Sequence, residues 1–167
     1  FKVPKGIGFW PAFWLMPNED IRWPVGGEID ILENRGRISN ISSSALHFGK
    51  QWNKKSTLVG EALIPRQVRF QDKFHSISLV WKENVIAFYL DNSLDPYFTI
   101  NSDHPEFQKY KYPFNRDYYM ILNVAVGGKY DDYWVDFDAF CNDEECSNKE
   151  DPDSHRFIID WIEYERL

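Results

Sequence analysis

The feature that most constrains this chain is hydrophobic alternation with a period of two residues, together with almost no helical periodicity. Between His75 and Trp81, isoleucine, leucine and tryptophan occupy alternate positions, with serine and valine between them. Successive side chains of a strand point to opposite faces, so the pattern predicts a half-buried β-strand. A second run, residues 85–90, follows the short polar segment Lys82-Glu83-Asn84. The two runs together predict a β-hairpin.

Two longer apolar runs extend the strand pattern. Residues 118–126 are apolar on both sides and stop at Gly127-Gly128, which predicts a central strand covered on both faces. Residues 157–164 predict the last strand. Loops rich in Pro, Gly, Asn and Asp join these runs, and a chain of 167 residues, 43% hydrophobic, is long enough for one core. The sequence therefore predicts a single all-β domain, an antiparallel β-sandwich or jelly roll.

The charge and the hydropathy of the chain narrow the classes of ligand that it is expected to bind. The net charge is −7, and residues 130–153 hold ten acidic residues against one lysine. Binding of nucleic acid needs a clustered basic face, so no nucleic-acid partner is expected. Apolar runs such as residues 120–126 are far too short to cross a bilayer, so no membrane partner is expected either. Neutral polymers remain, and the 17% aromatic residues fit either a large β core or a sugar-stacking cleft.

Three carboxylates gather in one short stretch of predicted strand. Glu28 and Asp30 share a face by alternation. Glu33 lies five positions after Glu28, an odd number, so a regular strand would point it into the apolar layer as an unpaired charge. A β-bulge around Ile31-Leu32 would return Glu33 to the face of the other two.

Such a trio is costly through like-charge repulsion unless one member holds a proton. Glycoside hydrolysis needs that division, with one ionised carboxylate as nucleophile and one carboxylic acid to protonate the leaving oxygen. Glu28 and Glu33 suit these two roles, and Asp30 lies between them, where it can hydrogen-bond either partner. The alternatives are a solvated acidic face and a calcium site made of the same three groups.

Longer motifs resemble the laminarinase-type members of glycoside hydrolase family 16. The resemblance runs from the first residues to the predicted last strand, in the family's order. It rests on Gly8-Phe9-Trp10-Pro11-Ala12-Phe13-Trp14-Leu15-Met16-Pro17, Trp23-Pro24, residues 27–33, Ala45-Leu46-His47-Phe48-Gly49, Phe74-His75-Ser76, Leu122-Asn123-Val124-Ala125-Val126-Gly127-Gly128 and Ile159-Asp160-Trp161.

The resemblance implies a concanavalin A-like jelly roll with a cleft across its concave sheet, and endo-hydrolysis with retained anomeric configuration. By position, Glu28 matches the nucleophile, Asp30 the assisting aspartate and Glu33 the acid/base. No cofactor is implied for catalysis. The Glu-x-Asp-x-x-Glu spacing is typical of β-1,3-glucan enzymes, so a laminarin-type β-glucan is the expected partner, although agar- and carrageenan-cleaving relatives share the spacing.

Further residues match the family's cleft and metal positions. Trp10, Trp14 and Trp23 match aromatic residues of the cleft, with core packing as the alternative. His47 has small neighbours on its own face and is expected to contact the substrate, the alternative being a satisfied core histidine. Asp160 matches an aspartate that binds a structural calcium ion in many relatives.

Cys141 and Cys146 bracket an acidic segment without other metal-ligand residues. A local disulfide is expected, with two free thiols as the alternative. Together with the family resemblance, this pair predicts a secreted protein.

The resemblance begins partway through the family's catalytic domain. Residues 1–167 are therefore expected to form one partial domain that lacks N-terminal strands, which a second polypeptide or a swapped copy of the chain would supply. Two other functions remain open on sequence grounds. One is a β-1,3-glucan recognition module without turnover, and the other is a calcium-dependent lectin of similar shape.

Overall fold

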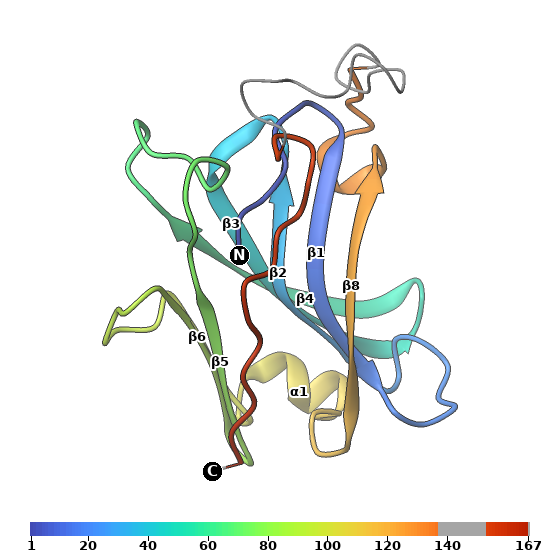
Figure 1. Cartoon of the computed structure of the whole chain (residues 1–167). Coiled ribbons are helices and arrows are strands. Elements are labelled where there is room, and N and C mark those ends of the chain that lie inside the picture. Colours follow the sequence, from blue (N-terminus) through green and yellow to red (C-terminus); the bar gives the residue numbers. More distant parts are fainter. Residues whose placement is uncertain (137–152, 167) are drawn as a thin grey trace.

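A computed structural model describes residues 1–136 and 153–166 of the chain as two antiparallel sheets (Figure 1). The larger sheet has the order β4-β3-β2-β1-β8, and the smaller has the order β5-β6-β7. The predicted all-β jelly-roll class is confirmed. The elements are β1 Phe9–Pro17, β2 Glu28–Arg35, β3 Ile38–Gln51, β4 Lys54–Leu63, β5 Ile77–Lys82, β6 Val85–Leu90, β7 Phe98–Asn101, helix α1 Pro105–Tyr110, β8 Tyr118–Val126 and the 3₁₀ turn η1 Lys129–Asp131.

The core fills the space between the two sheets and α1. It contains inward-facing side chains from both sheets and Phe107 from the helix, namely Leu15, Ile29, Ile31, Leu46, Phe48, Ile86, Phe88, Ile100, Phe107 and Phe114. The sheets approach each other closely where β4 meets β7. A Cβ on Gly60 would lie 2.3 Å from the Phe98 ring, so a side chain there would force the sheets apart.

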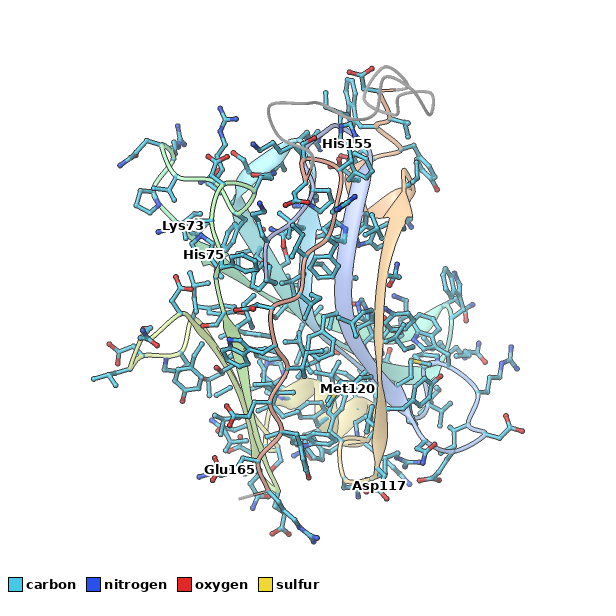
Figure 2. All side chains as sticks on the ribbon, in the orientation of Figure 1. Lys73, His75, Asp117, Met120, His155 and Glu165 are labelled. Atoms are coloured by element: carbon cyan, nitrogen blue, oxygen red, sulfur yellow. The ribbon has the colours of Figure 1, made fainter. Side chains whose placement is uncertain are left out.

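The predicted hairpin is confirmed. β5 and β6 pair antiparallel from Ile77 opposite Leu90 to Lys82 opposite Val85. The strand begins two residues later than its pattern indicated because the His75 N–H donates to the Phe1 carbonyl instead of to the hairpin. The His75 ring is buried against Phe70, which gives it a structural role at the start of the hairpin (Figure 2).

The strand predicted for residues 118–126 has the expected bounds, but its predicted central position is wrong. Among residues 1–136 and 153–166, β8 is the last strand of its sheet and pairs only with β1. Met120, labelled in Figure 2, is exposed together with Leu122, Val124 and Val126, and alternation places these four on the core side of the sheet. The apolar pattern indicates which faces of a strand can be buried, but it does not indicate whether neighbouring strands or helices are present to bury them.

The prediction of a last strand at residues 157–164 is also wrong. In this segment only Ile158 forms a β-bridge, to Lys2, so no ladder develops. The segment runs along the open side of the sandwich and ends beside the β5–β6 hairpin (Figure 1). Together with Phe13, Leu32 and Leu79, the segment lines a cavity of about 690 Å³. The space between the sheets is therefore incompletely filled on the side of β8.

No helix among residues 1–136 and 153–166 has the length and hydrophobicity needed to cross a membrane.

Candidate active site

The predicted bulge in β2 is confirmed by the pairing on both of its sides. Against β1, Asp30 lies opposite Trp14 and Leu32 lies opposite Phe13, so β2 contains one extra residue, Ile31. The ladder with β3 shifts by one residue in the same interval. Ile31 and Leu32 are both buried. The bulge therefore directs two apolar side chains inward and returns Glu33 to the face of Glu28 and Asp30.

Hydroxyl groups from β3 and from the residue just before β7 support the bulge. The Ser44 hydroxyl donates to the carbonyl of Ile31 at 2.6 Å. Because that hydroxyl proton is already used, the Tyr97 hydroxyl, 2.6 Å from Ser44 Oγ, must be the donor in the second bond. Burial raises the pKa of Tyr97 to about 12, which keeps its proton available. A buried chain of hydrogen bonds thus connects the smaller sheet to the backbone between the carboxylates.

Glu28 is positioned by the turn that precedes β2. Gly27 has a φ of +84°, and a Cβ there would lie 2.6 Å from the Tyr118 hydroxyl, so the position requires glycine. Tyr118 closes the turn by donating its hydroxyl to the Gly26 carbonyl at 2.6 Å. The indole Nε1 of Trp23 donates to Glu28 Oε2 at 2.5 Å. Strand pairing places His47 directly opposite Glu28.

Glu33 is held by an aromatic pair. Trp10 donates its indole N–H to Glu33 Oε1 at 2.9 Å. The Trp10 ring stacks on Tyr130, with centroids 4.9 Å apart and an interplanar angle of 22°. The Tyr130 hydroxyl in turn donates to the Glu33 carbonyl at 3.2 Å. These contacts fix both the backbone and the carboxyl group of Glu33.

Asp30 lies between the two glutamates and is almost fully buried. Its Oδ2 approaches His47 Nε2 at 3.0 Å, a short contact that lacks the alignment of a hydrogen bond. The other ring nitrogen of His47 lies 2.8 Å from the Thr57 hydroxyl on β4. Burial lowers the pKa of His47, although the charge of Glu28 opposes that shift. His47 therefore lies against the central carboxyl group of the site, with its other ring nitrogen next to Thr57.

Burial raises the pKa of all three carboxyl groups, to about 7 for Glu28 and Asp30 and about 8 for Glu33. The negative charge of Asp30 raises the pKa of both glutamates further. The indole N–H groups of Trp10 and Trp23 act in the opposite direction, because a donor stabilises the ionised form. The cluster thus retains protons near neutral pH, and Glu33 holds its proton most strongly.

The same cluster bears on metal binding. Among the described residues, one group of three metal-ligand side chains comes together, namely Glu28, Asp30 and His47, whose ligand atoms all lie within 4.8 Å of one another. The indole N–H of Trp23 is directed at Glu28 and competes with a cation for the same carboxylate. Asp160 is exposed and belongs to no such group among residues 1–136 and 153–166, so the structure adds no partner ligands to the predicted calcium position.

Comparison with known proteins places the chain in a family. The model of "Glycosyl hydrolases family 16" matches residues 1–137, which include all three carboxylates and the strands that present them. The chain belongs to this family. The resemblance inferred from its motifs is confirmed.

The relatives of this family-16 chain include two endo-1,3-beta-glucosidases and a beta-1,3-glucan-binding protein. It is 34% identical over 139 residues to glucan endo-1,3-beta-glucosidase A1 of Niallia circulans, covering 78% of the chain and 20% of that protein. It is 36% identical over 137 residues to a glucan endo-1,3-beta-glucosidase of Cryptopygus antarcticus, covering 77% and 49%. A beta-1,3-glucan-binding protein of Penaeus monodon is 33% identical over 153 residues, covering 76% and 41%.

A solved structure matches in fold as well. The laminarinase catalytic domain of Thermotoga maritima superposes with a TM-score of 0.71 at 31% identity, covering 79% of the chain and 53% of that domain. The chain thus spans about half of this structure, and at most about half of the curated relatives described above.

The structure brings most of the predicted site residues of the family-16 chain together. Trp10, Trp23 and His47 contact the carboxylates directly. Trp14 lies opposite Asp30 on the neighbouring strand, but its indole N–H donates to Asn123 Oδ1 on β8 at 2.8 Å. The predicted disulfide residues Cys141 and Cys146 lie outside the described residues.

Sequence reasoning missed the support behind Glu33. Arg35 lies over the Tyr130 ring, with its guanidinium carbon 4.2 Å from the centroid, and its Nε donates to the Tyr130 carbonyl at 3.1 Å. The buried Asp131 carboxylate lies 2.8 Å from Arg37 Nε. Tyr130 and Asp131 begin the acidic segment of residues 130–153, whose net charge gives no sign of these contacts. The signal in the sequence was the pair Arg35 and Arg37, two residues apart just after Glu33, which indicates a need for nearby acidic or aromatic partners.

Proposed function

We propose that the protein is a retaining endo-β-1,3-glucanase acting on laminarin-type β-glucans. The observation that carries the proposal is the bulged strand, which presents Glu28, Asp30 and Glu33 on one face with raised pKa values and an indole N–H on each glutamate. A solvated acidic face does not fit, since Asp30 and Glu33 are buried. The endo-1,3-beta-glucosidase names of two relatives support the choice of a β-1,3 linkage.

The chemistry follows from the difference between the two glutamates. Glu28, which matches the nucleophile of the family's motif and has a lower pKa than Glu33, attacks the anomeric carbon of the glucosyl residue in its ionised form. Glu33 retains its proton and transfers it to the leaving glycosidic oxygen. Water then hydrolyses the glycosyl-enzyme, with Glu33 as the base. Asp30 and His47 pack on the Glu28 side of the cluster, and their ionisation is coupled to that of Glu28.

Replacement of the nucleophile tests the proposal. In the intact protein, Glu28→Gln should lower kcat on laminarin by at least about 10³-fold, because an amide cannot form the glycosyl-enzyme, while glucan binding persists. Glu33→Ala should also be impaired, but added azide should restore turnover of an activated aryl glucoside, for which no acid is needed. Substantial hydrolysis by the Glu28→Gln variant would contradict the assignment.

A second function has its own support. The Penaeus monodon relative bears the name of a glucan-binding protein, so binding without turnover is the competing function. Release of reducing ends from laminarin distinguishes the two, and parallel assays on mixed-linkage glucan, agarose and carrageenan determine the substrate. A calcium-dependent lectin would lose binding on treatment with a chelator, whereas this mechanism needs no metal.

Two other expectations stay proposals. Secretion rests on the family and on the cysteine pair, which lies outside the described residues. The relatives give no support to a second polypeptide that supplies strands, and the uncovered side of β8 is the observation on which that expectation rests.

A further inference from the structure

A second tryptophan lies beside the Glu28 side of the site. Trp52 occupies the turn between β3 and β4 and is 70% exposed. Its ring centroid lies 5.1 Å from that of Trp23, at an interplanar angle of 48°. Trp23 is itself the residue whose indole N–H holds Glu28. Since a large aromatic ring is costly to leave in water, an exposed ring next to a site is a candidate contact for a ligand.

The fold fixes the distance between this turn and the cleavage point. His47 lies opposite Glu28, and the β3–β4 ladder ends four residues later, at Gln51 opposite Lys54. At a rise of about 3.3 Å per residue, the turn is about 13 Å along the strand from Glu28. The Trp23 ring occupies the interval, 6.4 Å from the His47 ring. The path from Trp52 to the nucleophile is therefore lined continuously by rings.

Backbone and charge contacts hold the two tryptophans together. The Gly49 N–H donates to the Pro24 carbonyl at 3.2 Å, which ties the Trp23 loop to β3. The Lys55 ammonium lies 5.1 Å from the Trp23 centroid and 5.6 Å from the Trp52 centroid. It contacts both rings and keeps donors free for a hydroxyl group. The exposed surface of Trp52 remains open to a ligand.

We propose that Trp52 and Lys55 form an additional glucosyl-binding subsite. It would take a residue of a neutral β-glucan chain beyond the one attacked by Glu28. The C–H face of a pyranose ring packs on the Trp52 indole, while Lys55 donates to a ring hydroxyl. This inference rests on the proposed function, and it makes Trp52 a determinant of the length of chain bound.

The test is binding of a length series of laminarioligosaccharides to the intact protein carrying Glu28→Gln, measured by calorimetry with and without Trp52→Ala. The loss of affinity caused by Trp52→Ala should grow with chain length and reach about tenfold on the longest chains, as expected when one ring contact worth about 1.4 kcal/mol is removed. Trp52→Phe should retain part of the affinity. Lys55→Met should weaken the same long chains, without a dependence on salt.

Trp161→Ala is the matched control, because Trp161 is 63% exposed and lies in the C-terminal segment. It should leave the whole series unchanged. An equal loss at every length would mean that Trp52 only supports Trp23, and it would overturn the inference. So would an absence of any loss, or an absence of glucan binding. Hydrolysis of laminarin is measured separately, with the protein that retains Glu28. If binding depends on chain length but laminarin is not hydrolysed, the proposed hydrolase function is wrong and the proposed subsite still holds.

Discussion

At the scale of single residues, each of the two glutamates accepts a hydrogen bond from one indole N–H group. Trp23 and Trp10 each donate one hydrogen bond, to Glu28 and Glu33 respectively. Each hydrogen bond lowers the pKa of its glutamate, whereas burial raises that pKa. Burial is the larger effect for both glutamates, so the donors moderate the shift and do not reverse it.

The sign of this effect gives a test. Trp10→Phe keeps an aromatic ring for Tyr130 but removes the donor, so the pKa of Glu33 should rise above its value of about 8. Loss of one hydrogen bond to a charged group corresponds to an upward shift of about one pH unit. The basic limb of the pH profile of kcat/KM should move by that amount. Trp14→Phe, whose donor serves Asn123, is the control and should leave the limb in place. A downward shift in the Trp10 variant would refute the role.

At the scale of elements, the decisive feature is one added residue in β2. A spacing of five positions cannot place two side chains on the same face of a regular strand, whereas the bulge at Ile31 can. The bulge depends on the chain next to the smaller sheet, because Tyr97, just before β7, donates its hydroxyl to Ser44, and Ser44 donates to the Ile31 carbonyl. The site is thus connected through the core to an element that has no part in the chemistry.

Ser44→Ala should expose that dependence. The change leaves the Ile31 carbonyl and the Tyr97 hydroxyl without their partner in a buried region, which costs about 1–3 kcal/mol in the free energy of unfolding. Denaturant unfolding measures the loss, and kcat should fall more than KM rises, since the bulge positions Glu33. Ser78→Ala, on the exposed face of β5, is the matched control. A wild-type kcat in the Ser44→Ala variant would show that the hydrogen bonds of Ser44 and Tyr97 do not affect the position of Glu33.

At the scale of the whole molecule, the larger sheet is well packed from β1 to β4 and poorly covered at β8. Met120, Leu122, Val124 and Val126 are exposed on its core side, and the outer edge of β8 has no neighbour among the described residues. An uncovered apolar row beside an open strand edge favours association with other chains.

The 167-residue chain by itself should therefore self-associate as its concentration rises, and Leu122→Lys should weaken the association. A charge in this row opposes burial of the strand against another chain. Sedimentation velocity over a concentration series measures both, with Leu94→Lys as the control because Leu94 is a single exposed side chain in a turn. A wild-type chain that stays monomeric at all concentrations would disprove the effect.

The sequence alone predicted the strand class, the hairpin, the need for a bulge and the grouping of three carboxylates on one face of β2. These follow from local rules: alternation has a period of two, and an odd spacing on one face requires an added residue. The contacts of Trp10 and Trp23 were predicted only as cleft positions, and their donors proved to be directed at the carboxylates themselves.

Only the tertiary structure decided the rest. The hydroxyl chain through Ser44, the support of Glu33 by Tyr130 and Arg35, and the edge position of β8 join residues separated by tens of positions in the chain. Alternation states which side of a strand is apolar, but the partner that covers that side is chosen by how the sheets pack. For the same reason the apolar pattern of residues 157–164 indicated a strand, while the fold gave that segment a single β-bridge.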